Sequence, residues 1–290
     1  MSGKYELLGR RDLDAASRPV SPYANKRERG TALIIGGSSR FHGAPVLASL
    51  AALRTGAGYV KTFVPKSVVD PARRLSSNII VAELGTREIR FNDEIRKEIE
   101  RSDAIAVGMG IGRSSPAVEC SRRIINSSIG NEKPIVVDAD ALMALKDIRI
   151  SARNGSVIAT PHDKEFQMAS GKKPSSSLSA RIRDAESFAE KKGIVVVLKG
   201  HNTIVTDGEK TKVCRPRSAA LATMGSGDVL SGIICGYAAQ GATALQSACA
   251  GVYLHAAIGD RLAKKMGMHI IAADLVDAIP LAIKEFDKSY

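Results

Sequence analysis

The chain has 290 residues, of which 44% are hydrophobic and 25% charged, a composition typical of a globular protein that excludes collagen, coiled-coil and largely disordered classes. Lys and Arg number 42 against 30 Asp and Glu, so the net charge of +12 is compatible with a nucleic acid or with a small polyanion such as a nucleotide. Aromatic residues make up only 4% and Trp is absent, which argues against a surface that stacks bases.

Three features bear on cellular location. The four cysteines form no CxxC pair, so we expect no structural zinc and a reduced, cytoplasmic environment. Residues 1–17 lack the apolar core of a secretory signal. Residues 218–259 carry Asp228 as their only charge, but glycines and Gln240 interrupt them. We therefore expect two buried helices there and no membrane span.

In chain order, short apolar runs alternate with segments that have helical spacing. Residues 1–28 are polar and charged, so we expect an N-terminal arm outside the core, followed by one domain over residues 29–290. Continuous apolar runs predict strands at residues 32–35, 59–64, 79–82, 104–107, 135–137, 157–159, 194–198 and 203–206. Apolar spacing predicts helices at residues 45–54, 93–101, 116–125, 178–192, 229–239, 242–265 and 272–284.

This alternation is typical of a mostly parallel sheet covered by helices. We predict an α/β fold of three layers, with helices on both faces of a mostly parallel central sheet.

Glycines and polar side chains follow the predicted strands. They form the segments Gly36–Ser39 with His42–Pro45, Gly108–Gly112, Asp138–Asp140, Thr160–Glu165 and Lys199–Asn202. Because ligands of parallel α/β sheets bind at the carboxyl ends of the strands, we expect one composite site at this edge.

The motif Gly225-Ser226-Gly227-Asp228 precedes the apolar helices near the end of the chain. Small residues let backbone N–H groups approach an anion, and a helix N-terminus favours negative charge. Asp228 could be only a helix cap. Its isolation in an uncharged stretch favours a functional carboxylate, typically a general base.

The other candidates each have a structural alternative. His162 could be an ordinary loop residue, Glu165 a charge at a helix N-terminus, and Asp138 a turn or cap residue. The chain has no Walker A motif, and Arg113 stands where a dinucleotide fingerprint beginning at Gly108 needs its third glycine. Their shared position at strand ends is what favours a common function.

From about Gly30 to its end, the chain resembles the ADP/ATP-dependent NAD(P)H-hydrate dehydratases of the ribokinase-like superfamily. The resemblance rests on an ordered set of motifs: His42-Gly43-Ala44, Ala51–Gly58, Asp138–Leu142, Thr160-Pro161-His162 with Glu165, Leu198-Lys199-Gly200 with Asn202-Thr203, Gly225–Gly232, Gly251–His255 and Gly259-Asp260. It implies a ribokinase-like fold and a repair reaction. A nucleotide phosphorylates the ring hydroxyl of hydrated NADH or NADPH, and loss of phosphate restores the dinucleotide.

The resemblance also implies roles for single residues. Asp228 would be the base on the hydroxyl, and the amides of residues 225–227 would form an anion hole. ADP or ATP would be bound by Lys199, Gly200, His201, Asn202, Thr203, Gly225, Ser226 and Gly227. The hydrate would be bound by Ala44, Gly110, Gly112, Asp138, His162 and Asp228. Glu165 would act on Mg²⁺ through water.

The chain departs from the resembled pattern at several positions. Met143 stands where Asn is frequent, Asp163-Lys164 where Pro-Gly is usual, and Met224 where a further glycine is usual. These differences concern loop geometry rather than the role of Asp228. Many members carry an N-terminal epimerase domain, and with about 29 residues before the first predicted strand we expect none here.

Other functions stay open. A ribokinase-like small-molecule kinase acting on a vitamin-precursor alcohol would share Asp228 and the anion hole but stop at the phosphate ester. Thr160-Pro161-His162 and Lys199-Gly200 favour the dehydratase. A nucleic-acid-binding protein is less favoured because the basic residues are spread along the chain, and an oxidoreductase because the dinucleotide fingerprint fails. We expect a homo-oligomer, with a tetramer as the candidate assembly, and no nucleic-acid or membrane partner.

Overall fold

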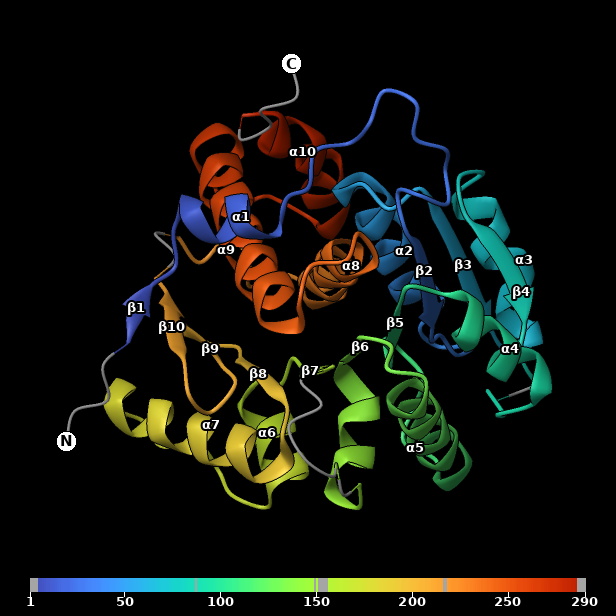
Figure 1. Cartoon of the computed structure of the whole chain (residues 1–290), viewed down its shortest axis with the longest axis horizontal. Helices are drawn as coiled ribbons and strands as arrows, with labels where there is room; N and C mark the ends of the chain where they lie inside the picture. The colour runs from blue at the N-terminus through green and yellow to red at the C-terminus, as the bar shows by residue number, and fades with distance from the viewer. Residues whose placement is uncertain (1–4, 87, 149, 151–155, 216–217, 286–290) are drawn as a thin grey trace.

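A ten-stranded sheet forms the centre of the computed structural model, which describes residues 5–86, 88–148, 150, 156–215 and 218–285 (Figure 1). The strands are β1 (Glu6–Leu7), β2 (Thr31–Ile35), β3 (Tyr59–Val64), β4 (Ile80–Glu83), β5 (Ala104–Val107), β6 (Ile135–Val137), β7 (Val157–Ala159), β8 (Val195–Leu198), β9 (Thr203–Thr206) and β10 (Thr211–Cys214). Their order is β1-β10-β9-β8-β7-β6-β5-β2-β3-β4. The pairs from β8 to β4 are parallel, whereas β9 is antiparallel to β8 and to β10. The predicted mostly parallel α/β sheet is confirmed.

Helices cover both faces of the sheet, as predicted (Figure 1). One face carries α4 (Asp93–Arg101), α5 (Ser115–Gly130), the 3₁₀ helix η1 (Ala139–Lys146), α6 (Asp163–Ser170) and α7 (Leu178–Lys192). The other carries α2 (Gly43–Thr55), α8 (Ser226–Ala239) and α9 (Ala244–Met266), with α3 (Lys66–Leu75) packed beside α2 and β4. Outside these, α1 (Arg10–Ala16) and α10 (Ala272–Lys284) pack against α8 and α9.

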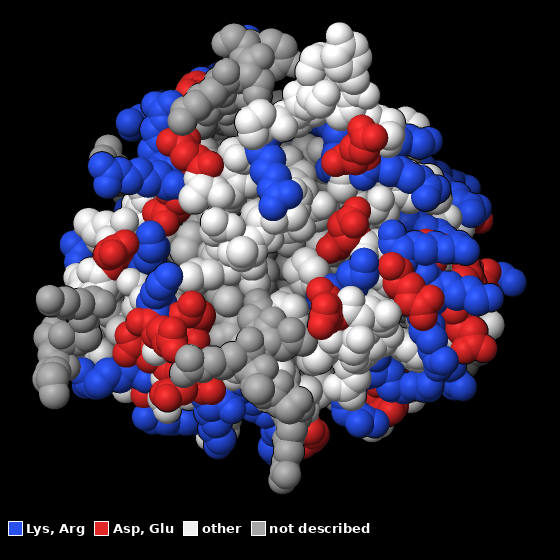
Figure 2. All heavy atoms as spheres, viewed as in Figure 1, with Lys and Arg blue, Asp and Glu red and all other residues white. Residues whose placement is uncertain are grey.

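The surface in Figure 2 mixes basic and acidic side chains on the face that it shows, without one continuous basic stripe. No helix in the described part of the chain is long and apolar enough to cross a membrane.

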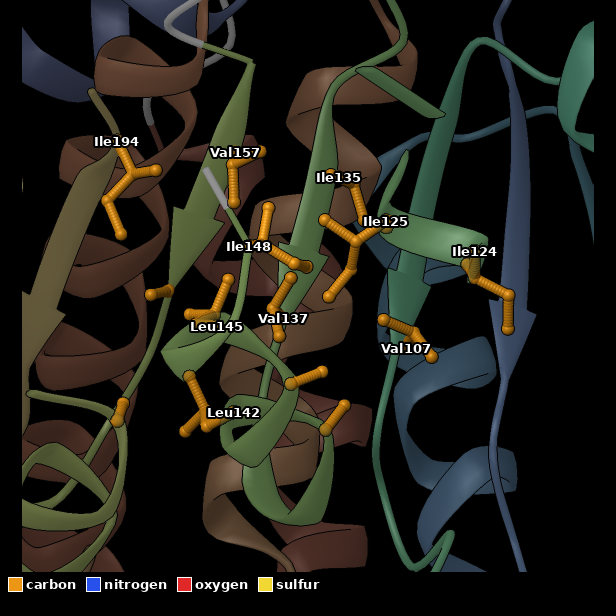
Figure 3. Packing of buried hydrophobic residues seen from close by; sticks show 14 of the residues in the cluster. Val107, Ile124, Ile125, Ile135, Val137, Leu142, Leu145, Ile148, Val157 and Ile194 are labelled. Carbon is orange, nitrogen blue, oxygen red and sulfur yellow. The ribbon is translucent and has the colours of Figure 1, made fainter. Parts of the chain in front are cut away.

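Alternation along the strands separates the two cores. In β2, Leu33 and Ile35 face the α4–α7 side, whereas Ala32 and Ile34 face α2 and α8. Figure 3 shows the first core, where Leu142 and Leu145 of η1 pack with Val137 at the end of β6. Both faces are buried, which explains why the strands are continuous apolar runs.

Two glycines let α8 lie close against α2. A Cβ atom at Gly232 would come within 2.2 Å of the Ala48 carbonyl oxygen, and one at Gly236 within 2.8 Å of Thr55 Cβ. The Gly-x-x-x-Gly spacing therefore serves helix packing inside this fold, and it fixes the position of the α8 N-terminus.

The N-terminal segment differs from the expected arm. β1 pairs with β10, and α1 buries Leu13 completely against the helical layer. Asp12 on α1 accepts a hydrogen bond from Lys212 Nζ on β10 at 2.6 Å. Residues 6–16 thus belong to the sheet and core. A two-residue strand and a seven-residue helix are too short to give a periodic apolar pattern.

The chain turns from β2 toward β3 and β4 on one side and returns through β5 on the other. The ends of β2 and β5 therefore form a topological switch point, where parallel sheets open a crevice for ligands. The loops after these strands contact each other there, since Gly37 N donates to the Met109 carbonyl oxygen at 2.8 Å.

Candidate active site

Four neighbouring parallel strands bring the predicted polar segments to one edge of the sheet. β5, β6, β7 and β8 end just before Gly108, Asp138, Thr160 and Lys199. The Lys199 amide donates to the Pro161 carbonyl oxygen at 2.8 Å, which joins the last two loops. These four segments are neighbours because of the strand order, which cannot be read from the sequence.

The Lys199 ammonium lies at the centre of the site. Its Nζ donates to Asp138 Oδ1 at 2.9 Å and lies 3.6 Å from Glu165 Oε2. Burial acts to lower the pKa of Lys199, but the carboxylates of Asp138 and Glu165 outweigh it and raise that pKa above its usual value. Lys199 therefore stays charged and links the residues assigned to the nucleotide with one assigned to the hydrate.

Asp138 is buried and has partners on both carboxylate oxygens. Besides Lys199, it accepts a hydrogen bond from Ser231 Oγ of α8 at 2.8 Å. Burial raises its pKa, but the Lys199 charge and the hydrogen bonds more than compensate, so the pKa of Asp138 lies below its usual range. Asp138 occupies the N-cap position of η1, but its side chain makes no capping hydrogen bond. No pattern in the sequence indicates Ser231 as a partner of Asp138, because the two residues are 93 positions apart along the chain.

The N-terminus of α8 is built on a glycine. Gly225 has a φ of 87°, and a Cβ atom there would lie 2.8 Å from Leu47 Cδ1 and 2.9 Å from Ala272 Cβ. The Ser226 amide donates to the Thr223 carbonyl oxygen at 3.3 Å. The first turn of a helix leaves amide groups without intrahelical partners. The amides of Gly227 and Asp228 are therefore better placed for an anion than that of Ser226.

Asp228 occupies the third position of α8 and is half-buried. Burial first, and the nearby charge of Asp138 second, raise the pKa of Asp228 to about 7, while Lys199 opposes the shift. A carboxylate of this kind is well matched to accept a proton near neutral pH. It lies next to a helix N-terminus that favours an anion. These two groups together suit the transfer of a phosphoryl group to a hydroxyl.

A cavity of about 890 Å³ opens beside the N-terminus of α8. It is large enough for a nucleotide. Six of the eight predicted nucleotide residues line it: Lys199, Gly200, His201, Thr203, Ser226 and Gly227. Asn202 and Gly225 are not among the lining residues. Its apolar wall includes Leu221, Leu230 and Val252.

His255 of α9, which is not among the predicted site residues, also lines this cavity. Its Nε2 lies 3.0 Å from Ser226 Oγ. Burial lowers the pKa of His255 to about 4, so the ring is neutral at pH 7. Only its place in a motif shared with the resembled family marked this residue in the sequence.

His162 and Glu165 form a reciprocal cap on α6. His162 Nδ1 accepts from the amides of Lys164 and Glu165 at 3.1 and 3.3 Å, and Glu165 Oε2 accepts from the His162 amide at 2.8 Å. The structural alternative, in which these two residues stabilise a loop and the start of a helix, therefore describes contacts that they do make. His162 also lines the cavity that contains the nucleotide motif, although the resemblance assigns it to the hydrate. Among the described residues, no group of three metal-ligating side chains occurs. Glu165 therefore offers a single carboxylate to a metal, and that carboxylate lies beside Lys199.

Ala44, Gly110 and Gly112 lie at the switch point rather than in the large cavity. A Cβ atom at Gly110 (φ 71°) would lie 2.7 Å from Phe41 Cβ and 3.4 Å from Ala44 Cβ. The Gly112 amide donates to Asp140 Oδ2 at 3.2 Å. Three of the six predicted hydrate residues thus form a second group, whereas His162 lines the cavity and Asp138 is hydrogen-bonded to Lys199 at its edge.

Comparison with known proteins agrees with this geometry. The family model described as NAD(P)H-hydrate dehydratase matches residues 32–281. The chain is 33% identical over 268 residues to the ADP-dependent (S)-NAD(P)H-hydrate dehydratase of Nitrosopumilus maritimus, covering 91% of this chain and 92% of that protein. It also matches longer bifunctional NAD(P)H-hydrate repair enzymes, and it spans about half of their length, 52% in the first case.

Solved structures support the fold. A ribokinase-like superfamily protein from Enterococcus faecalis superimposes with a TM-score of 0.85 at 23% identity, covering 98% of this chain and 97% of that one. The ADP/ATP-dependent NAD(P)H-hydrate dehydratase of Bacillus subtilis, co-crystallised with ATP and Mg²⁺, gives 0.82 at 24% identity, covering 98% and 99%. The fold is ribokinase-like, as the resemblance implied. With a family model that covers most of the chain and a relative of similar length, the chain belongs to the NAD(P)H-hydrate dehydratase family.

Proposed function

We propose that the chain is an ADP- or ATP-dependent NAD(P)H-hydrate dehydratase, a lyase that restores NADH and NADPH from their hydrates. The observation that carries the proposal is the Asp228 carboxylate. Its pKa of about 7, its place at the α8 N-terminus and the adjoining cavity suit phosphoryl transfer to a hydroxyl.

In this reaction the nucleotide binds in the cavity with its phosphates at the amides of Gly227 and Asp228. Asp228 accepts the proton of the ring hydroxyl while that oxygen attacks the terminal phosphorus, and the bond from phosphorus to the nucleotide breaks. Phosphate then leaves with the C–O electron pair, and the ring loses a proton from the neighbouring carbon. Hydrate and ATP thus give the reduced dinucleotide, ADP, phosphate and a proton, and ADP as donor gives AMP.

The remaining residues bind and orient. Ala44, Gly110, Gly112 and His162 contact the hydrate, with Asp138 fixed by Lys199 and Ser231 at its border. Lys199 stays charged, so it compensates negative charge that accumulates between the two groups. Glu165 would hold Mg²⁺ through water, because Mg²⁺ keeps several waters and binds few protein carboxylates. The metal would neutralise charge on the nucleotide phosphates.

The test is incubation of the protein with NADH hydrate, Mg²⁺ and either ADP or ATP, following the absorbance of reduced nicotinamide and the release of phosphate. Asp228→Asn should lower kcat by ~10²–10⁴-fold, the usual cost of removing a positioned base. Asp274→Asn, in the first turn of α10, is the matched control and should retain activity. A chelator should stop turnover.

Two outcomes would contradict the proposal. Full turnover without nucleotide would exclude the phosphorylation step. Accumulation of a phosphate ester without return of reduced nicotinamide would assign the chain to the small-molecule kinases instead.

We also propose that the protein is a cytoplasmic homo-oligomer without a nucleic-acid partner, and that its single domain includes residues 6–16. Leu75 at the end of α3 and Ile80 on the edge strand β4 are exposed apolar side chains that a second copy of the chain could cover. Light scattering coupled to gel filtration tests the assembly, and a gel-shift assay at low salt tests nucleic-acid binding.

A further inference from the structure

Arg181 on α7 is a nearly buried cation that the proposed mechanism does not use. Only 12% of its side chain is exposed. Its Nη1 donates to Asp163 Oδ2 at 2.9 Å and its Nη2 to Asp163 Oδ1 at 2.8 Å. The same Nη2 donates to the Lys199 carbonyl oxygen at 3.3 Å. A planar guanidinium in this two-pronged contact fixes direction as well as distance.

The partners of Arg181 belong to two separate segments that both line the large cavity. Asp163 begins α6 next to His162, and Lys199 begins the loop that leads through Gly200 to Thr203. The loop lies directly against the guanidinium, because a Cβ atom at Gly200 would be 3.0 Å from Arg181 Nη2. Arg181 itself is not among the residues that line the cavity, so it borders the site from outside.

This contact explains one departure from the resembled pattern. Asp163 stands where proline is usual in the resembled family, and its carboxylate supplies both acceptors of the guanidinium. One consequence is that the α6 N-terminus and the loop after β8 are joined through a side chain as well as through the Lys199–Pro161 backbone bond.

We propose that Arg181 is a positioning residue that keeps the Lys199–Thr203 loop in the conformation that binds the nucleotide. The identity of that nucleotide rests on the proposed function. Loss of the guanidinium frees the Lys199 carbonyl and Gly200, whereas the Lys199 ammonium keeps its own partner in Asp138. The variant therefore loses nucleotide affinity while the groups around Asp228 stay in place.

The experiment compares the wild-type protein with Arg181→Lys and Arg181→Gln. Lysine keeps the charge but cannot form the two-pronged contact. Lys172→Gln is the matched control, because it breaks the 2.6 Å ion pair between Lys172 and Asp184 of α7. Neither of these two residues lines the cavity. We measure the Kd of ADP and ATP by calorimetry, the KM of nucleotide and hydrate, kcat and the melting temperature.

Both Arg181 variants should raise the Kd and KM of the nucleotide about tenfold or more, the effect of losing one charge-assisted hydrogen bond. The KM of the hydrate, and kcat at saturating nucleotide, should change less than about twofold. Lys172→Gln should leave all of these constants unchanged. Asp163→Asn should weaken nucleotide binding by a smaller factor, because the bond to the Lys199 carbonyl persists.

Nucleotide affinity that stays within twofold of wild type, whatever the melting temperature, would show that Arg181 serves stability alone and would overturn the proposal. So would an equal rise in the KM of the hydrate. If wild-type protein binds nucleotide but restores no reduced dinucleotide, the proposed function fails, while the calorimetric comparison still decides the role of Arg181.

Discussion

Asp228 shares the buried end of α8 with a second carboxylate, Asp138, and with the Lys199 ammonium. The ammonium is hydrogen-bonded to Asp138, whose pKa is lowered, and this leaves Asp228 as the carboxylate whose pKa is raised. Two carboxylates whose environments separate their pKa values take different roles, one as fixed charge and one as base. Because the folded protein disfavours the charged form of Asp228, we expect its free energy of unfolding to depend on pH.

The first prediction concerns pH. Asp228 has a folded-state pKa of about 7 against an ordinary value of 3.8, so its contribution to stability is fully present below 3.8 and is lost as pH rises to about 7. Asp228→Asn removes this dependence, so its melting temperature relative to wild type should be higher at pH 8 than at pH 5. In wild type, kcat/KM should rise through a pKa near 7, because the base must be deprotonated.

Asp93→Asn is the control for stability, since Asp93 lies in the first turn of α4 with 85% of its side chain exposed. Its difference from wild type should be nearly independent of pH over this range. If Asp228→Asn behaved like this control, the raised pKa of Asp228 would be contradicted.

The second prediction separates the cap from the ligand contact at His162. His162→Ala removes the acceptor of two amides of α6 and should destabilise the protein by about 1 kcal/mol, whereas His162→Asn retains a capping oxygen. Both variants should raise the KM of the hydrate with kcat little changed, since an interaction made equally in ground and transition states affects KM.

Steady-state kinetics and melting temperatures of the two variants provide the check. A fall in kcat with constant KM would assign His162 to the chemistry. Recovery of the hydrate KM in His162→Asn would reduce its role to capping.

At the scale of single residues, the sequence identified those that follow strands, because strand ends and glycines are local patterns. Asp228 was found from its isolation among apolar residues. Roles were not assigned to Arg181, Ser231 and His255, because each acquires its partner only through tertiary packing. Arg181 contacts the loop after β8, Ser231 contacts Asp138 after β6, and His255 of α9 contacts Ser226 of α8. A charge within a regular helix gives no sign that its partner is a loop carbonyl.

Among the elements, the crossing of α2 and α8 sets the position of the α8 N-terminus. Because α8 carries both Asp228 and Ser231, a small shift of this helix moves the base and the partner of Asp138 together. Contacts at Gly232 and Gly236 keep the two helices close.

The third prediction tests this crossing with Gly232→Ala. The new methyl group would meet the Ala48 carbonyl oxygen at 2.2 Å, so the helices must separate, with a loss of about 1–3 kcal/mol and reduced kcat. Gly130→Ala at the end of α5 is the control, because a Cβ atom there has no neighbour within 4 Å. It should be neutral or slightly stabilising. Equal melting temperatures of the two variants would show that the crossing tolerates expansion.

Element prediction succeeded for helices whose apolar residues recur at helical spacing. The predicted bounds of α4, α7 and α10 match the structure. α6 and η1 were missed because they are short and directly follow site loops, whose glycine, proline and polar residues predict turns rather than helices. β10 was missed because its four residues, Thr211–Cys214, begin with a threonine and a lysine, which leaves only two apolar residues in succession.

For the whole molecule, the N-terminal segment is an integral part of the structure. Leu13 is fully buried in the cluster formed with α9 and α10, whereas Leu7 on β1 is 58% exposed. Strand pairing and the Asp12–Lys212 contact hold this segment at the sheet edge beside β10.

The fourth prediction follows from that burial. Leu13→Ala should lower the free energy of unfolding by about 2–5 kcal/mol, as for other large-to-small core changes. Leu7→Ala should change it by less than about 0.5 kcal/mol, as for a surface position. Urea denaturation of both variants checks this, and equal midpoints would show that α1 is not part of the cooperative core.

The Asp12–Lys212 contact spans 200 residues, so residues 6–16 leave the ribosome long before β10 and α9 exist to receive them. During synthesis this segment cannot pair until β10 has been made, so we expect its docking to be a late step in completing the sheet edge. Contacts made late in folding affect the rate of unfolding more than that of folding. We therefore expect loss of β1 and α1 to shorten the lifetime of the native state while leaving the rate of refolding nearly unchanged.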